Sequence, residues 1–200
     1  IDNRAGGSGA IGIEIATRAT PDGYTLAIIE LPHTVLTTTL ARVPYNLLRD
    51  FAPLTMIGTS PMILFVNTTL PVKSLPEFIA LARAKQGALL MAHTGHGSIS
   101  HLVSELVQQR TGTRFNQIGY KGAAPAFIEL AGGQVQAYFA TLASGASALK
   151  TGRIAALAIA GKKRLDALPG VPTLAESGVP DVVAEQGVYP EPMVPGGSST

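Results

Sequence analysis

The sequence predicts an α/β fold in which a parallel-rich sheet is flanked by helices on both faces. Short strand candidates alternate with helix candidates of modest length along most of the chain. The strand candidates are apolar nearly throughout, as in Ile-Ala-Ala-Leu-Ala-Ile-Ala at 154–160, which is typical of strands buried on both faces. Polar or glycine-rich loops follow several of these strands, and ligands gather at the carboxyl ends of strands in such sheets.

The composition supports a folded protein with a substantial core. Of the 200 residues, 46% are hydrophobic and 14% are charged, a balance that excludes intrinsic disorder. The net charge of +2 is small and the basic residues are scattered, so we expect no nucleic-acid partner. No apolar run reaches membrane-spanning length, so we expect a protein that is not embedded in a membrane. The absence of cysteine excludes disulfides and thiolate chemistry.

The first sixty residues are expected to hold a helix and a strand. A glycine-rich stretch at 3–9 leads into a helix at 10–19, where apolar residues recur at helical spacing. Turn residues at 20–23 separate this helix from an apolar, β-branched strand at 24–29. Prolines and an asparagine interrupt any long element in 31–48.

From residue 62 onward the two kinds of element alternate regularly. Capping boxes at 74–77 and 173–176 predict helix starts, and glycines at 87, 112, 132 and 178 predict helix ends. Strands are expected at 62–67, 89–91, 115–118, 135–140 and 154–160. Helices are expected at 74–85, from Ser98 to Gly112, at 123–131 and 144–151, with a short one ending at Gly178.

The stretch 91–102, Met-Ala-His-Thr-Gly-His-Gly-Ser-Ile-Ser-His-Leu, is the most informative part of the chain. A strand runs into a glycine-punctuated turn, and a helix follows at once with Ser98 at the N-cap position. Such a corner directs several backbone N–H groups and the positive end of a helix dipole to one point. The pattern predicts an anion-binding site.

Two other kinds of site compete for the same stretch. His93, His96 and His101 suggest a metal, yet no carboxylate or cysteine accompanies them at ligand spacing, so we expect no metal and no cofactor. A Ser98/His101 nucleophile pair lacks an orienting acid and a G-x-S-x-G turn, so we expect no enzyme. A histidine-based metal-binding receptor and a hydrolase remain the alternatives.

Several motifs, in the right order over about residues 1–182, resemble the extracytoplasmic solute receptors of tripartite tricarboxylate transporters, often called Bug proteins. The similarity is strongest in Gly95-His96-Gly97-Ser98 and in Tyr120-Lys121-Gly122-Ala123-Ala124-Pro125-Ala126. Further similar motifs lie at 3–12, 21–26, 44–46, 50–53, 70–75, 132–135 and 168–173.

The resemblance implies a two-lobed periplasmic binding protein of the type II-like Venus flytrap kind. Lobe 1 would comprise 1–65 with 184–200 and lobe 2 would comprise 66–183, with N- and C-terminal parts of lobe 1 and the export signal missing from this chain. Such a receptor captures a small organic carboxylate, a di- or tricarboxylate, and hands it to membrane permease subunits. The resemblance also implies that the protein works in the periplasm of a Gram-negative bacterium, binds no cofactor and does not turn over its ligand. We also expect a monomer.

The loops and the resemblance together give a set of candidate ligand-binding residues. They comprise the central turn, the loop at 119–123, the loop after the strand at 135–140, and two residues that follow the strand at 24–29. The residues are Thr94, Gly95, His96, Gly97, Ser98, His101, Tyr120, Lys121, Gly122, Ala123, Thr141, Ser144, His33 and Thr34.

Overall fold

The computed structural model describes residues 2, 4, 9–30, 33, 43, 45–52 and 58–192, without the side chains of residues 30 and 187–192. The chain divides into two compact units, one comprising 1–59 with 186–200 and the other comprising 60–185. The lobe boundaries expected from the sequence, after residues 65 and 183, remain a prediction. Strand β2 (Gly58–Asn67) begins in the first unit and continues into the second.

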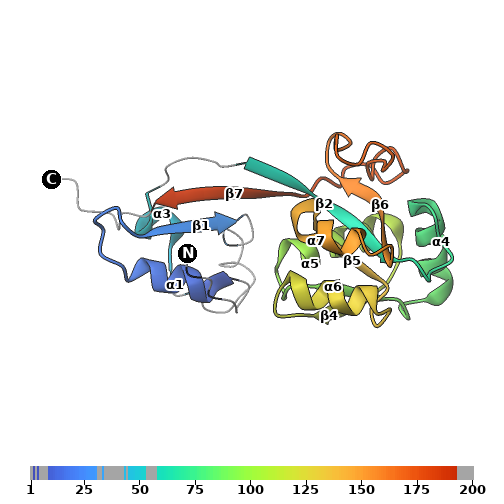
Figure 1. Cartoon of the computed structure of the whole chain (residues 1–200), viewed down its shortest axis with the longest axis horizontal. Helices are drawn as coiled ribbons and strands as arrows, with labels where there is room; N and C mark the ends of the chain where they lie inside the picture. The colour runs from blue at the N-terminus through green and yellow to red at the C-terminus, as the bar shows by residue number, and fades with distance from the viewer. Residues whose placement is uncertain are drawn as a thin grey trace. The chain divides into compact units, whose positions relative to one another are not determined.

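The first unit contains a helix beside a two-stranded antiparallel pairing (Figure 1). Helix α1 (Ala10–Thr17) and strand β1 (Leu26–Glu30) are followed by a short helix, α3 (Leu47–Asp50). Strand β7 (Glu185–Pro192) pairs with β1. A small apolar core holds these elements together and consists of Ile13, Ile29, Tyr45 and Phe51.

The second unit is built on a sheet with the strand order β4–β3–β5–β2–β6. The strands other than β2 are β3 (Leu90–His93), β4 (Asn116–Gly119), β5 (Ala137–Thr141) and β6 (Ile154–Ala160). Strand β3 pairs in parallel with β4 and with β5. Strand β2 pairs antiparallel with both β5 and β6, so β3 to β6 share one direction and β2 runs against them.

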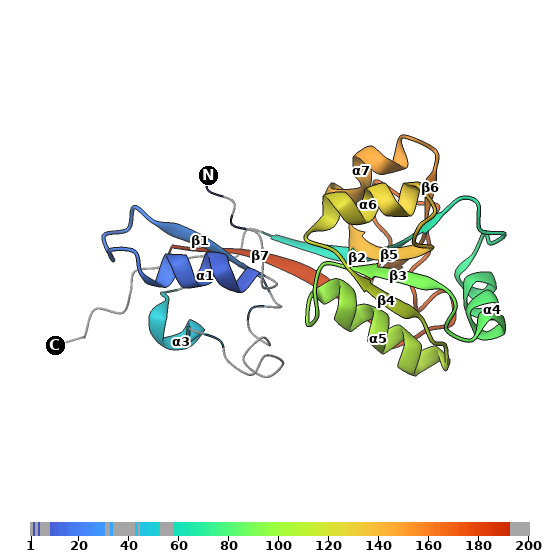
Figure 2. The same cartoon turned by 90° about the horizontal axis from the view of Figure 1, so that it is seen from below.

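Helices cover both faces of this sheet (Figure 2). Helices α4 (Leu75–Lys85) and α5 (Ile99–Thr111) contribute to one apolar cluster, the first core cluster, which includes Phe78, Val103 and Leu64. Helices α6 (Ala123–Ala131) and α7 (Leu142–Leu149) contribute to the other, the second core cluster, which includes Phe127 and Phe65. Because successive residues of β2 from Met62 to Val66 enter opposite clusters, all five of them are apolar.

The expected α/β class is confirmed, but the sheet is mixed because of β2. The four strands joined by crossover helices α5, α6 and α7 are parallel, as βαβ units require. Helix α4 instead connects β2 to β3, which is not a neighbour of β2 in the sheet. The direction of β2 is therefore set by long-range pairing, which an apolar run does not encode.

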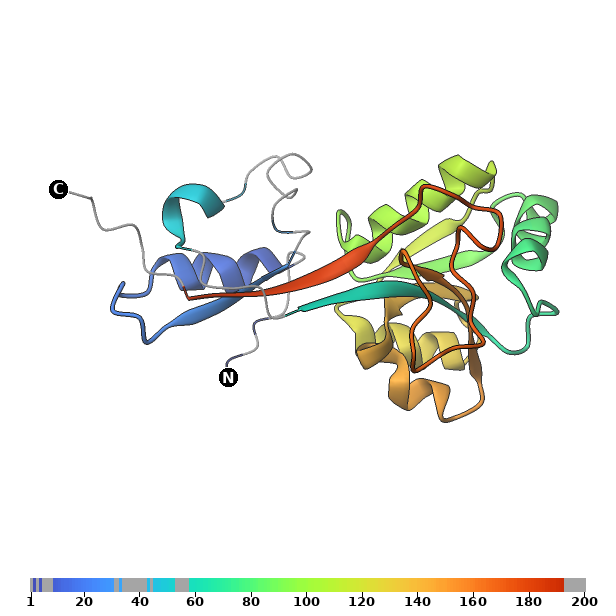
Figure 3. The same cartoon turned by 90° about the horizontal axis from the view of Figure 1, so that it is seen from above.

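The prediction of a short helix ending at Gly178 is wrong, because this segment forms turns (Figure 3, orange to red). The capping-box hydrogen bonds do form: the N–H of Glu176 donates to Thr173 Oγ1 (3.0 Å), and the N–H of Thr173 donates to Glu176 Oε2 (2.7 Å). The N–H of Val179 then returns to the carbonyl of Leu174 (2.9 Å), and Gly178 has a φ of 88°. These contacts close a single turn, so no helix propagates.

Replacing Gly145 of α7 tests how tightly α7 packs on the sheet. A Cβ there would lie 2.7 Å from Phe65 Cζ and 2.9 Å from Phe127 Cζ. Alanine gains about 1 kcal/mol in helix propensity over glycine, but overpacking costs about 1–3 kcal/mol. We expect Gly145→Ala to lower the free energy of unfolding in urea, whereas Ser147→Ala, on an exposed position of the same helix, should not. An unchanged Gly145→Ala midpoint would show that α7 packs loosely.

Candidate functional site

Three helix N-termini meet the sheet of the second unit at the same edge. Strands β3, β4 and β5 are parallel neighbours, and each is followed by a helix, α5, α6 and α7 in turn. The chain leaves β3 towards one face of the sheet and leaves β5 towards the other, because α5 and α7 lie on opposite faces. This is the kind of switch in connectivity at which open α/β sheets bind ligands.

The loop at 94–98 is held tightly against the start of α5. Gly95 and Gly97 have φ angles of 128° and 77°, which favour glycine. Ser98 is the N-cap, and its Oγ accepts from the N–H of His101 (3.4 Å), as the sequence predicts. The N–H of Thr94 donates to Ser100 Oγ (3.1 Å). The loop is therefore fixed by its own polar groups.

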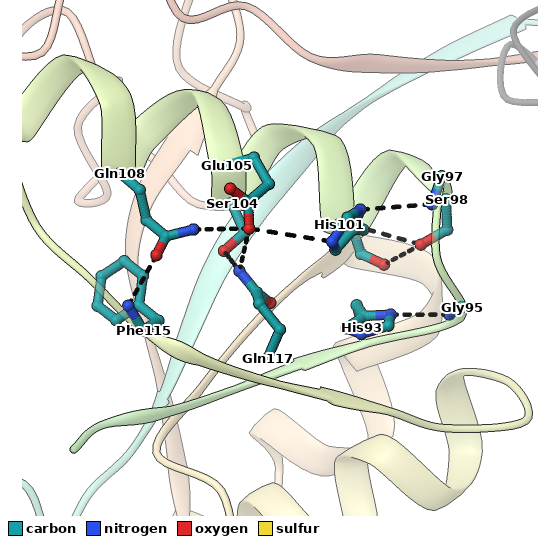
Figure 4. A network of polar contacts seen from close by, with 11 residues as sticks. His93, Gly95, Gly97, Ser98, His101, Ser104, Glu105, Gln108, Phe115 and Gln117 are labelled. Atoms are coloured by element: carbon teal, nitrogen blue, oxygen red, sulfur yellow. Dashed lines mark hydrogen bonds and ion pairs between the residues drawn. The ribbon is translucent and has the colours of Figure 1, made fainter. Parts of the chain in front are cut away.

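Two imidazoles also accept hydrogen bonds from this loop (Figure 4). The N–H of Gly95 donates to His93 Nδ1 (3.0 Å), and the N–H of Gly97 donates to His101 Nδ1 (3.3 Å). An accepting Nδ1 carries no proton, so each neutral ring carries its proton on Nε2. Burial lowers the pKa of both His93 and His101, which keeps the rings neutral at neutral pH.

The backbone N–H groups that remain available to a ligand follow the loop glycines in sequence and belong to the first turns of the helices. Among the hydrogen bonds of the described residues, none uses the N–H of Ile99 or Ser100, the first two residues of α5. Helix α6 has Gly122 at its N-cap position. Because glycine has no side chain, no side-chain cap satisfies the first N–H groups of this helix. At α7, Thr141 Oγ1 accepts from the N–H of Ser144 (3.4 Å) and lies 2.7 Å from Ser144 Oγ.

Tyr120 and Lys121 lie in the turn between β4 and α6. The N–H of Tyr120 donates to the carbonyl of His93 (2.8 Å), which extends the β3–β4 pairing by one bond. Its side chain packs partly buried against the second core cluster, and burial raises its pKa. Lys121 is exposed and takes part in none of the ion pairs found among the described residues.

The sequence comparison identifies the family. Residues 1–189 match the tripartite tricarboxylate transporter family receptor. Protein BugT of Bordetella pertussis is 38% identical over 186 residues, which is 92% of this chain and 57% of BugT. The chain belongs to this receptor family. It therefore spans little more than half of the length of that relative.

Solved receptor structures share the fold. Rpa4515 of Rhodopseudomonas palustris, solved with adipate, is 34% identical with a TM-score of 0.92; the match covers 100% of this chain and 67% of that one. MatC of the same species, solved with malate, is 26% identical with a TM-score of 0.86, covering 97% of this chain and 66% of that one. The mixed α/β architecture is thus that of the receptor family.

The candidate residues His33 and Thr34 are distant in sequence from the loops that follow β3, β4 and β5. His33 is buried in the first unit, and its Nε2 would lie 2.1 Å from a Cβ placed on Gly9, the N-cap of α1. Glycine at position 9 is thus required by the close approach of the imidazole. Thr34 lies outside the described residues.

The structure brings together the rings of His93, His96 and His101, which come from the single stretch 91–102. The ring centroids are 5.0 Å apart for His93 and His96, 4.8 Å for His93 and His101, and 5.1 Å for His96 and His101. Glu105 lies beside them, with its Oε1 3.9 Å from His101 Nε2, but the group of described residues that could share an ion comprises the three histidines. Glu105 follows His101 by one helical turn, and this spacing places the two side chains on the same face of α5.

His93 is the residue that the candidate set omits. It is fully buried, and no hydrogen-bond partner for its Nε2 is found in the described part of the chain. Its Cε1 would lie 3.2 Å from a Cβ on Gly119, so this ring rests on the neighbouring strand. The available sequence signal was its place as the last residue of a strand, immediately before a glycine turn.

The geometry around Ser98 differs from that of a nucleophile and its base. Ser98 Oγ accepts from the backbone N–H of His101 and lies 2.9 Å from Ser100 Oγ. The imidazole of His101 contacts Gly97 through Nδ1 and faces Glu105 through Nε2. No hydrogen bond between Ser98 Oγ and the His101 ring is found among the described residues.

Within the described helices, none has the length and apolar character needed to cross a membrane.

The lowered pKa values of His93 and His101 give a stability prediction. Below about pH 6.5, the ordinary pKa of histidine, the unfolded chain takes up protons before the folded chain does. The free energy of unfolding should therefore fall as pH drops from there towards the lower folded-state values. Denaturant unfolding with a chelator present measures this, together with an NMR titration of the imidazoles. Either ring titrating at or above its ordinary pKa would contradict the lowering of its pKa by burial.

Proposed function

We propose that this chain is the solute-binding part of a periplasmic receptor that delivers a small organic carboxylate to the membrane permease subunits of a transporter. The observation that carries the proposal is the gathering of the N-termini of α5, α6 and α7 at one edge of the sheet. Uncapped N–H groups at such ends favour an anion. The adipate and malate named in the titles of two related structures support a carboxylate as the solute.

Backbone donors are strong enough for this task. Micromolar affinity corresponds to about 8 kcal/mol, and one hydrogen bond to a charged group contributes about 1.5–3 kcal/mol. A handful of preorganised donors therefore suffices without an arginine. The N–H groups of Ile99, Ser100 and Ala123 are the first candidates, and the hydroxyls of Thr141 and Ser144 add polar groups after β5.

The proposal assigns the two compact units to the two lobes of the receptor. Lobe 1 would contain 1–59 with 186–200, and lobe 2 would contain 60–185 with the loops proposed to bind the carboxylate. The protein would act as a monomer and release its ligand unchanged. The role of Lys121 in this scheme is to attract the anion over a distance, since its side chain is exposed.

Calorimetry on the intact receptor tests the proposed function. Adipate, malate, succinate and citrate would be titrated separately, with the ligand recovered and analysed afterwards. We expect saturable binding of at least one of these carboxylates, one molecule per chain, with no product formed. Turnover of the ligand, or no binding across the panel and a wider set of small carboxylates, would refute it.

A proline at the first position of α6 tests the role of its backbone donors. Proline suits the first turn of a helix, so Ala123→Pro removes one N–H with little effect on folding. We expect the dissociation constant for the carboxylate to rise by at least about tenfold, as loss of one charged hydrogen bond implies. The matched variant Ala123→Ser keeps the N–H and should bind within a few-fold of the natural protein. Equal affinities of the two variants would place the ligand away from α6.

A further inference from the structure

The three histidines at the start of α5 form a cluster that the carboxylate site does not require. One ring nitrogen from each of His93, His96 and His101 can be chosen such that all three lie within 4.8 Å of one another. His93 is fully buried, His101 is half-buried and His96 is exposed, so the cluster extends from the interior to the surface. The buried Nε2 of His93 has no hydrogen-bond partner among the described residues, an arrangement that is unfavourable unless a ligand occupies it.

We propose that His93, His96 and His101 bind one divalent transition-metal ion, with Zn²⁺ as the reference ion. Neutral imidazoles are preferred ligands of zinc and of its neighbours in the first transition row. Three such ligands leave a further coordination position, which water occupies in open zinc sites. This inference is independent of the proposed carboxylate function.

The distances permit such a site after a small contraction. Ligand nitrogens at about 2.0–2.1 Å from a tetrahedral zinc lie roughly 3.3 Å from one another. The three ring nitrogens now lie within 4.8 Å of one another, so rotations of the side chains have to bring them closer. His96 is the exposed member and lies in the loop, so most of this movement falls to it.

Glu105 supplies negative charge beside the cluster. Its Oε1 lies 3.9 Å from His101 Nε2, and the same oxygen accepts from Gln108 Nε2 (2.8 Å) and Gln117 Nε2 (3.2 Å). These amides fix the carboxylate next to the imidazole (Figure 4). Because this carboxylate faces the same Nε2 of His101 that would hold the ion, it adds a negative charge close to the cation.

Binding through Nε2 would change the loop at 94–98. The Nε2 proton of His93 has to move to Nδ1 when the metal takes its place, because the ring stays neutral. The protonated Nδ1 can no longer accept from the N–H of Gly95, so that hydrogen bond is broken. The same shift at His101 releases the N–H of Gly97. Both glycines have positive φ angles. Glycine adopts many backbone conformations, so this part of the loop can change its conformation when the hydrogen bonds are released.

The experiment is a titration of the intact receptor, without a polyhistidine tag and freed of metal by a chelator, with ZnCl₂. Calorimetry would give the stoichiometry, and Co²⁺ in place of Zn²⁺ would report coordination through its visible spectrum. We expect one ion per chain and a change in the amide NMR signals of Gly95 and Gly97. His96→Ala should weaken binding by at least about tenfold, whereas Gln109→Ala, at an exposed position of α5, should not.

Controls make each result decisive. The unfolding midpoint of His96→Ala, measured with chelator present, should equal that of the natural protein, so that lost binding cannot reflect lost folding. Absence of saturable Zn²⁺ binding, or binding that His96→Ala leaves unchanged, would overturn the proposal. Carboxylate binding measured in the presence of chelator is a separate experiment, so failure of the metal site and failure of the receptor function are distinguishable.

Discussion

Parallel pairing of β3 with β4 on one side and β5 on the other is the interaction on which the site depends. It brings the ends of three strands to one edge, with bonds such as that from the N–H of Tyr120 to the carbonyl of His93 fixing the register. The crossover helices then begin at that edge and lie on opposite faces of the sheet. The helix N-termini therefore gather because of sheet topology, before any side chain is considered.

Burial of β2 on both faces makes this arrangement rigid. Its residues from Met62 to Val66 are almost fully buried, and they feed two separate apolar clusters. Asn67 ends the strand with a buried hydrogen bond from Nδ2 to the carbonyl of Leu130 (2.6 Å), which ties β2 to the end of α6. A buried amide satisfied in this way is costly to disturb. The polar loops are thus mounted on a well-packed support.

The loop at 94–98 combines two kinds of chemistry within a few residues. Its backbone and the first turn of α5 offer donors to an anion, while the imidazoles that hold its glycines offer nitrogens to a metal. The same hydrogen bonds connect the two, because His93 and His101 accept from Gly95 and Gly97 only while their Nδ1 atoms carry no proton. Any event that moves those protons also changes which backbone donors are available.

The sequence by itself determined the local features of the second unit. Ser74 and Ser98 cap helices at the expected residues, α6 and β6 have the expected bounds, and Gly112 ends α5 in the left-handed conformation. These features depend on hydrogen bonds between residues a few positions apart, and their signals lie in short stretches of sequence. The family motifs likewise identified the receptor family.

The tertiary structure decided what depends on distant residues. The antiparallel direction of β2 comes from its pairing with β5 and β6, which lie more than seventy residues away in the chain. The segment ending at Gly178 forms a turn because its backbone closes on Leu174, and Glu176 within it pairs with the distant Arg164. The burial of His93 and its contact with two other rings depend on how α5 packs over β3 and β5. Strand direction and side-chain convergence arise from long-range packing, which residue pattern alone does not specify.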